Sequence, residues 1–219
     1  MIAALHVIVN EIKRHFGLEK VRLLDMPCGD MRYMSRFLST RSDIAYTGID
    51  IVSDIITHHR KTFQDHPWVF RHADIVADDF DNNFDLIISR HMLQHLENAA
   101  IFSIFRKISV ETRHPSFLLV TTFSNSQPNL ELNMKMRGRY RPVNVEIAPF
   151  RLEPPLCMFR DGPIRGDRLT SFMGLWRLPL MTIPESICKS TEFPTVLAPR
   201  PLYSCVDWKS EINFRYNNN

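Results

Sequence analysis

The sequence has few cysteines and lacks the cysteine pairs that mark structural zinc sites. Four cysteines occur in 219 residues, and none of them forms a C-x-x-C pair. The count is also low for a secreted protein held together by disulfides. We therefore expect no metal site, and we expect reduced thiols in a cytoplasmic protein at Cys28, Cys157, Cys188 and Cys205.

The sequence also lacks a long apolar run and a strong charge imbalance. The apolar first five residues are soon followed by Glu11, Lys13 and Arg14, without a basic start or a small-residue cleavage site. The net charge is only +3, and no basic stripe with interleaved aromatic residues occurs. We expect no membrane span and no nucleic-acid partner. A small-molecule substrate is expected, and the oligomeric state is left open.

Hydrophobic periodicity predicts strands and helices in alternation over the first half of the chain. Helices are predicted at 2–16, 31–40, 53–64 and 98–110, and strands at 21–25, 44–49, 68–72, 84–88 and 117–122. Such alternation is typical of an α/β protein with a doubly wound parallel sheet. Beyond it we expect a long loop over 124–170 that includes a short strand near 155–160, another strand at 171–178, and an irregular tail rich in proline and asparagine over 181–219.

The turn after the first strand is poor in glycine. Asp25 ends the strand, and Pro27, Cys28 and Gly29 follow. A glycine allows a sharp turn and a close approach of the backbone to a ligand. The dinucleotide fingerprint has three glycines, and only one is present here, which argues against a nicotinamide oxidoreductase. Taken alone, this segment is also compatible with an ordinary strand-to-helix turn.

Three acidic residues fall just past three successive strands. They are Asp25, Asp50 and Asp74, and Asp50 lies about 20 residues beyond the glycine turn. An acid at that distance holds the ribose hydroxyls in nucleoside-binding sheets, because a carboxylate accepts two hydrogen bonds. A single such acid is more often a helix cap. Three acids at the same depth of a sheet favour a ligand site.

Three segments together resemble the class I S-adenosylmethionine-dependent methyltransferases. They are Leu24-Asp25-Met26-Pro27-Cys28-Gly29-Asp30, Tyr46-Thr47-Gly48-Ile49-Asp50-Ile51-Val52 and Phe84-Asp85-Leu86-Ile87-Ile88-Ser89-Arg90. A subfamily with a Pro-Cys-Gly-Asp first turn is also similar at Arg141-Pro142-Val143-Asn144 through Pro149-Phe150 and at 174–178. The resemblance implies one methyltransferase-like domain over 1–180, with a Rossmann-like sheet of about seven strands and an antiparallel last strand.

The resemblance further implies a site for S-adenosylmethionine across the carboxyl ends of the first strands. Asp25, Cys28 and Gly29 line its methionine part, Asp50 and Ile51 hold the ribose, and Asp74 and Ile75 frame the adenine. Arg90, His91 and His95 lie near the sulfonium and the acceptor. The expected activity is methyl transfer to a small-molecule or saccharide acceptor.

Catalytic roles are predicted for His91 and Arg90. His91 is the candidate base because histidine titrates near neutral pH, and Arg90 is placed to orient an anionic acceptor. Hydrogen bonding within the loop explains either residue equally well. Met31 replaces the third family glycine, and the upstream glycine- and serine-rich segment of the subfamily is not in this chain. A catalytically inactive interaction protein with the same fold therefore stays open.

Overall fold

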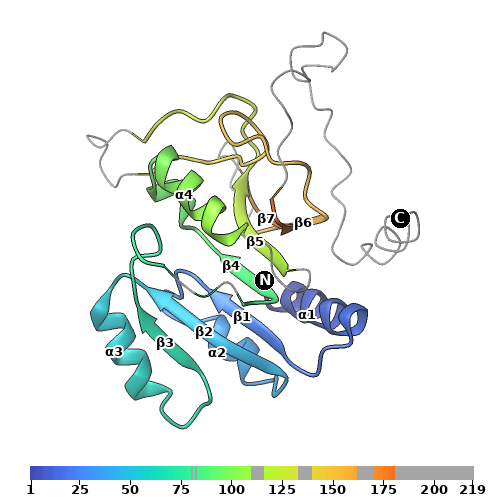
Figure 1. Cartoon of the computed structure of the whole chain (residues 1–219), viewed down its shortest axis with the longest axis vertical. Coiled ribbons are helices and arrows are strands. Elements are labelled where there is room, and N and C mark those ends of the chain that lie inside the picture. Colours follow the sequence, from blue (N-terminus) through green and yellow to red (C-terminus); the bar gives the residue numbers. More distant parts are fainter. Residues whose placement is uncertain (80, 82, 110–115, 133–139, 162–169, 181–219) are drawn as a thin grey trace.

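The computed structural model describes residues 1–79, 81, 83–109, 116–132, 140–161 and 170–180. The strands are β1 (Val21–Asp25), β2 (Ile44–Asp50), β3 (Val69–His72), β4 (Leu86–Ser89), β5 (Ser116–Phe123), β6 (Cys157–Arg160) and β7 (Ser171–Leu178). They form one sheet in the order β3-β2-β1-β4-β5-β7-β6 (Figure 1). Strands β1 to β5 are parallel, and β7 runs antiparallel to both β5 and β6. The predicted α/β class, the doubly wound Rossmann-like sheet and the antiparallel last strand are confirmed.

Helices cover both faces of this sheet. They are α1 (Ile2–Phe16), α2 (Met34–Leu38), α3 (Ser53–Thr62) and α4 (Asn98–Ile108). Buried side chains of α1, α2 and α3 pack with Leu23 in one hydrophobic cluster, and those of α4 pack with Leu24 in another. Neighbouring strand residues point to opposite faces, so this alternation places α4 opposite the other three helices (Figure 1).

Several predicted boundaries differ from the structure by one to three residues, and two of these differences have a clear local reason. Helix α2 begins at Met34 and not at Met31, because Met31 has a φ of 59° and cannot continue a right-handed helix. Strand β4 begins at Leu86 and not at Phe84. Just before it, the Asp85 carboxylate accepts the backbone N–H of Arg22 at 2.7 Å and its guanidinium at 2.9 Å. This ion pair ties the start of β4 to β1.

The cysteines differ from one another in state. Cys28 is free and buried, as expected, whereas Cys157 is part of a disulfide. The prediction of four reduced thiols is therefore wrong for Cys157. Cys188 and Cys205, together with the predicted tail over 181–219, lie outside the described residues.

None of the helices in the described part of the chain has the length and apolarity needed to cross a bilayer.

Candidate functional site

The site lies where the strand order reverses, because β1 pairs with β2 on one side and with β4 on the other. In open α/β sheets, ligands bind outside the carboxyl ends of the strands at such a switch point. Asp25 ends β1, Asp50 ends β2, and Arg90 directly follows β4. The topology therefore brings together three residues that the sequence assigned to one site.

The glycine turn is held against the end of β2. The N–H of Cys28 donates to the carbonyl of Ile49 at 2.9 Å, and the N–H of Gly29 donates to Asp50 Oδ2 at 3.0 Å. Gly29 has a φ of 52°, which glycine adopts without strain. A Cβ at position 48 would lie 2.9 Å from Cys28 Cβ, so only a glycine there lets the turn approach β2 this closely.

The Asp50 carboxylate supports the glycine turn and can still accept further hydrogen bonds. Its Oδ1 takes the N–H of Val52 at 3.0 Å, so each carboxylate oxygen holds one backbone N–H. A carboxylate oxygen accepts two hydrogen bonds, which leaves one acceptor position on each oxygen. Next to this acid, the side chains of Ile51 and Val52 are 61% and 45% exposed. Two hydrogen-bond acceptors beside an exposed apolar surface suit a ribose joined to a flat base.

Asp25 is completely buried beneath the turn. The Tyr46 hydroxyl donates toward its Oδ2 at 3.2 Å, and its Oδ1 has no hydrogen-bond partner among the described residues. Burial raises the pKa of Asp25 to about 7, although the Tyr46 hydrogen bond and the Arg90 charge act in the opposite direction. The same burial, with the negative charges of Asp25 and Asp50, raises the pKa of the Cys28 thiol well above its ordinary value. The thiolate form of Cys28 is therefore disfavoured.

Met31 stands where the methyltransferases that this sequence resembles have a third glycine, and the backbone keeps the conformation of the turn. Its φ of 59° is the left-handed conformation that a glycine would adopt there. Its side chain is buried, and the Tyr46 hydroxyl points toward its Sδ at 3.0 Å. Packing therefore compensates for a backbone conformation that is unfavourable for methionine.

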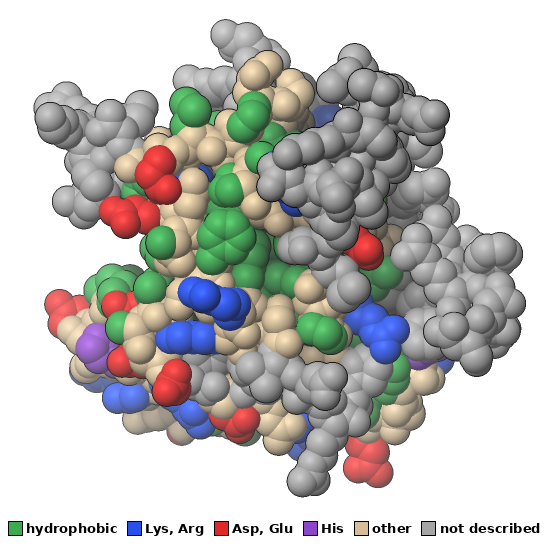
Figure 2. Space-filling view, turned by 45° about the horizontal axis from the view of Figure 1, so that its top comes forward, with side chains coloured by type: hydrophobic (Ala, Val, Ile, Leu, Met, Phe, Trp, Pro, Cys, Tyr) green, Lys and Arg blue, Asp and Glu red, His purple; other side chains and the backbone are tan. Residues whose placement is uncertain are grey.

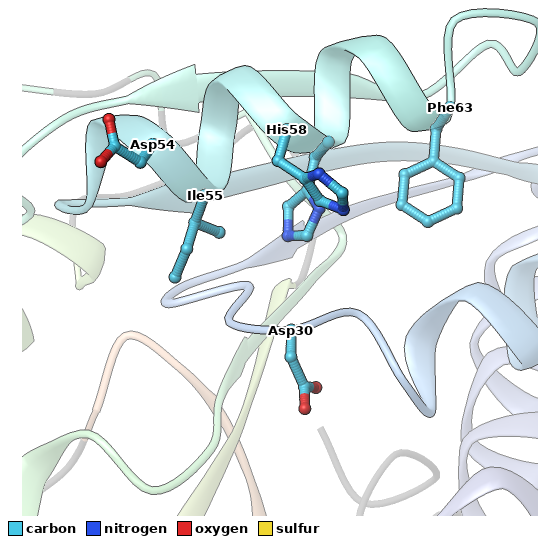
Figure 3. Close-up of a pocket in the computed structure, with 6 residues that line it drawn as sticks. Asp30, Asp54, Ile55, His58 and Phe63 are labelled. Atoms are coloured by element: carbon cyan, nitrogen blue, oxygen red, sulfur yellow. The ribbon is translucent and has the colours of Figure 1, made fainter.

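A hollow of about 360 Å³ lies between α3 and Asp30, the residue that follows Gly29. Figure 3 shows Ile55 and His58 of α3, and Phe63 just after it, projecting toward the loop that carries Asp30. His59 also lines this hollow and is the buried histidine of the helix. Its Nε2 donates to the Gly29 carbonyl at 2.6 Å, so α3 fixes the turn through a single hydrogen bond.

Replacing His59 by phenylalanine is expected to loosen the glycine turn. The ring contacts with Phe63 and Phe70 are retained, but the Gly29 carbonyl loses its donor, at roughly 1–2 kcal/mol of stability. Urea unfolding should show this loss, and binding of S-adenosylhomocysteine should weaken about tenfold. His58→Phe is the matched control, because His58 is exposed on the same helix. Equal effects of the two substitutions would contradict a role of His59 in the turn.

Asp74 and Ile75 lie beyond the end of β3, at the outer part of this edge. The Asp74 carboxylate accepts the N–H of Val76 at 2.9 Å and of Ala77 at 3.3 Å. It therefore caps its own turn, and its predicted contact with the adenine stays a prediction. Ile75 is partly buried and packs against the α4 cluster.

On the other side of the switch point, Arg90 forms a two-pronged ion pair with Asp161. Arg90 Nε and Nη2 donate to the Asp161 carboxylate at 2.9 and 3.0 Å. The Arg90 guanidinium also lies over the Tyr33 ring, with Cζ 5.0 Å from the ring centroid. Arg90 thereby joins the β6–β7 hairpin to the segment that follows the glycine turn.

His91 is held through both ring nitrogens. Its Nε2 lies 3.2 Å from Asp161 Oδ2, and its Nδ1 lies 3.1 Å from the Gln94 side-chain nitrogen. A neutral ring satisfies both contacts when Nε2 carries the proton and Nδ1 accepts from Gln94. The His91 backbone has a φ of 55°, and its N–H donates to Thr121 Oγ1 at 2.9 Å. In this arrangement neither nitrogen has a free lone pair to take a proton from an acceptor.

Asp161 is expected to stabilise the protein through its charge. Burial acts to raise its pKa, but the hydrogen bonds from His91 and Arg90 hold the pKa at about 2, below its ordinary value of 3.8. A depressed pKa gives stability that is present above about pH 4 and is lost as the pH falls toward 2. Asp161→Asn should therefore lower the free energy of unfolding by roughly 2 kcal/mol at pH 7, and the difference should shrink below pH 4.

Urea unfolding of both proteins between pH 2 and pH 7 measures this effect. Asp30→Asn is the control, because the ion pair of Asp30 with Arg32 is highly exposed and contributes little. A pH-independent difference between Asp161→Asn and the wild type would contradict the charge assignment.

His95 lies in a short 3-10 helix, η1 (Leu93–His95), and is exposed. The His95 ring packs edge-to-face on the Tyr140 ring, with 5.7 Å between the ring centroids. On the face shown in Figure 2, hydrophobic side chains gather in a central hollow, and basic side chains border it.

Several residues of the site were not found from the sequence. They are Tyr33, Tyr46, Gly48, His59, Gln94, Thr121 and Asp161. Asp161 had a usable signal, since it is an acid directly after a predicted strand, like Asp25 and Asp50. The two tyrosines gave no signal, because aromatic residues at such spacings are usually core. Within the described residues, no group of three or more His, Cys, Asp or Glu side chains is arranged to hold a metal ion.

Comparisons with known proteins agree with this geometry. Residues 23–112 match the family described as a methyltransferase domain. That segment contains the glycine turn and Asp50, Arg90 and His91. A comparison with curated protein sequences finds no match.

Solved structures share the fold at low sequence identity. One is the 1,6-didemethyltoxoflavin-N1-methyltransferase of Burkholderia thailandensis with 1,6-didemethyltoxoflavin and S-adenosylhomocysteine bound (TM-score 0.58, 20% identity, 80% of this chain and 78% of that chain). Another is the N-methyltransferase NodS of Bradyrhizobium japonicum with S-adenosylhomocysteine (TM-score 0.56, 13% identity, 80% and 85%). A protein of Pyrococcus horikoshii is also similar (TM-score 0.51, 14% identity, 80% and 90%).

Proposed function

We propose that this chain, which has the fold of the class I S-adenosylmethionine-dependent methyltransferases, uses that cofactor to methylate a small-molecule acceptor. The observation that supports this most directly is the hydrogen bond from the Gly29 N–H to the Asp50 carboxylate at the switch point. This hydrogen bond holds a carboxylate with two open acceptor positions beside a tight turn and next to exposed apolar residues. The methyltransferase family match covers the same residues.

The residues present fit the cofactor. Asp50 has an open acceptor position on each oxygen for the ribose hydroxyls, and Ile51 offers an exposed apolar surface for the base. Asp25 Oδ1, buried and unpartnered among the described residues, is an acceptor for an ammonium group. Cys28 and Gly29 complete the wall beside the methionine part. We assign Ile75 and the backbone near Asp74 to the adenine edge, and Arg90 and His95 to the acceptor side.

When bound, the cofactor supplies a methyl group that is already activated and leaves a neutral thioether. The chain therefore has to align the acceptor and exclude water from it. Asp161 holds Arg90 and His91 in fixed positions for this task. Deprotonation of an acceptor by His91 would require that Nδ1 first leaves Gln94. We assign Arg90 and His91 mainly to positioning of the acceptor, and a base role for His91 stays a prediction.

Two of the solved structures of this fold belong to enzymes named as N-methyltransferases, and one holds its small-molecule acceptor. We extend the small-molecule class, but not the particular compound, to this chain. A saccharide acceptor stays within the proposal.

Calorimetric titration of the full chain with S-adenosylmethionine and S-adenosylhomocysteine tests the proposal. Micromolar binding of both, in a sample whose folding is verified by circular dichroism, is the expected result. A folded protein that binds neither compound would instead favour a non-catalytic interaction protein with the same fold.

A further inference from the structure

Three ring side chains from separate segments meet beside the carboxyl ends of β4 and β5. The Tyr140 ring lies 5.7 Å from His95, with an interplanar angle of 60°, and 6.3 Å from Phe123, with an angle of 85°. We call these three residues the aromatic wall. Phe123 is buried, while Tyr140 is 45% exposed and His95 is exposed. The exposed Tyr140 ring therefore packs on the buried Phe123 ring and leaves part of its own surface open to solvent.

The aromatic wall is anchored from below by Arg141, whose side chain is 8% exposed. Its backbone N–H donates to the Gln94 carbonyl at 3.1 Å, and its Nη2 donates to the Leu96 carbonyl at 2.9 Å. These bonds fix Tyr140 over the loop that follows β4. The Gln94 side chain is the one that holds His91. The wall is therefore connected directly to the proposed acceptor side.

The cation of the proposed acceptor side, Arg90, is already compensated, whereas Arg141 is buried beneath the wall. The positive charge of Arg90 is paired with Asp161, which also receives the His91 hydrogen bond. An anionic acceptor would have to compete with a buried carboxylate for Arg90, which is unfavourable. Both ring nitrogens of His91 are engaged, so an acceptor that must lose a proton finds no free base there.

We propose that the acceptor is a neutral, planar heteroaromatic compound that packs against the exposed rings of Tyr140 and His95 and is methylated on an unprotonated ring nitrogen. This inference rests on the proposed function. The nitrogen lone pair forms the new bond to the methyl carbon, and the bond from that carbon to sulfur breaks with its electron pair left on sulfur. The positive charge passes from sulfur to nitrogen, and no proton has to leave.

The test uses isoquinoline as a planar neutral probe, with benzoate as a planar anion and piperidine, which is protonated at pH 8, as a non-planar cation. Each is titrated into the full chain at pH 8 with saturating S-adenosylhomocysteine. Methyl transfer to isoquinoline from S-adenosylmethionine is followed by mass spectrometry. We expect isoquinoline to bind more tightly than the other two and to yield N-methylisoquinolinium.

The variants Tyr140→Ala and Tyr140→Phe locate the binding. Removing the ring should weaken isoquinoline binding about tenfold, whereas Tyr140→Phe should retain it, because the ring face and not the hydroxyl makes the contact. Both variants should bind S-adenosylhomocysteine like the wild type. Equal isoquinoline affinity for Tyr140→Ala and wild type, or tighter binding of benzoate or piperidine, would overturn the inference. Failure of the wild type to bind S-adenosylhomocysteine would instead overturn the proposed function, and this inference with it.

Discussion

Asp50→Ala is expected to weaken binding of S-adenosylhomocysteine at least ~100-fold, because two hydrogen bonds to a charged acceptor are lost, each of roughly 1.5–3 kcal/mol. The same change leaves the N–H groups of Gly29 and Val52 without their carboxylate partner. Loss of the ribose contacts and loss of turn order act in the same direction. Calorimetry at constant pH and salt measures the affinity, and circular dichroism verifies the fold.

Asp74→Ala is the matched control for Asp50→Ala. Both acids accept an N–H of the turn that follows their strand, but only Asp50 also accepts the N–H of Gly29 across the switch point. Removal of the Asp74 carboxylate should therefore weaken binding far less than removal of the Asp50 carboxylate. If Asp74→Ala loses as much affinity as Asp50→Ala, or if Asp50→Ala loses none, the assignment of Asp50 to the ribose is wrong.

Asp25→Asn is expected to make the cofactor-free protein more stable at alkaline pH. The folded protein keeps the Asp25 proton up to about pH 7, whereas the unfolded chain loses it near the ordinary value of 3.8. The folded state therefore binds more protons over this interval, and its stability falls as the pH rises from about 4 to about 7. The full effect is about 4 kcal/mol above pH 7, and asparagine removes it.

Urea unfolding of wild type and Asp25→Asn at pH 4 and pH 8 tests this prediction. The two proteins should differ little at pH 4, and the variant should be more stable at pH 8. Tyr46→Phe is a useful comparison, because removing the Tyr46 hydrogen bond should raise the pKa of Asp25 further. A variant that is less stable than wild type at pH 8 would contradict the buried, proton-binding carboxyl.

The same carboxyl links cofactor binding to protons. An ammonium group beside Asp25 favours its ionised form, so binding near pH 6.5 should release a proton. Calorimetry in two buffers with different ionisation enthalpies measures that release. Asp25→Asn should bind more weakly and release none. A stability penalty retained at a buried acid is typical of functional residues, which supports the proposed role of Asp25.

The sequence predicted the sheet well because its signals are local. Strands β1 and β2 were recognised by short apolar runs that end in an acid, and parallel pairing alone then brings Asp25 and Asp50 to one edge. The start of α2 was predicted wrongly because Met31 adopts a positive φ, and a methionine in a sequence does not indicate such a backbone conformation.

Long-range contacts could not be predicted from the sequence. Asp161 lies 71 positions from Arg90 and comes from a segment of weak periodicity, so nothing local indicates their ion pair. The contacts of the His91 ring with Gln94 and Asp161 could not be predicted for the same reason. Sequence reasoning thus located the residues of the loop after β4, but it could not show which of their atoms are already bonded.

The hairpin of β6 and β7 returns a late part of the chain to the edge where the early strands end. Residues that face the proposed cofactor all lie within the segment that matches the family, whereas Phe123, Tyr140 and Asp161 come after it. The cofactor side is therefore encoded in one block of sequence, whereas the acceptor side combines Arg90 and His95 from that block with residues of the next. A change of acceptor should thus require changes in both blocks, while the methyl donor depends on the first block alone.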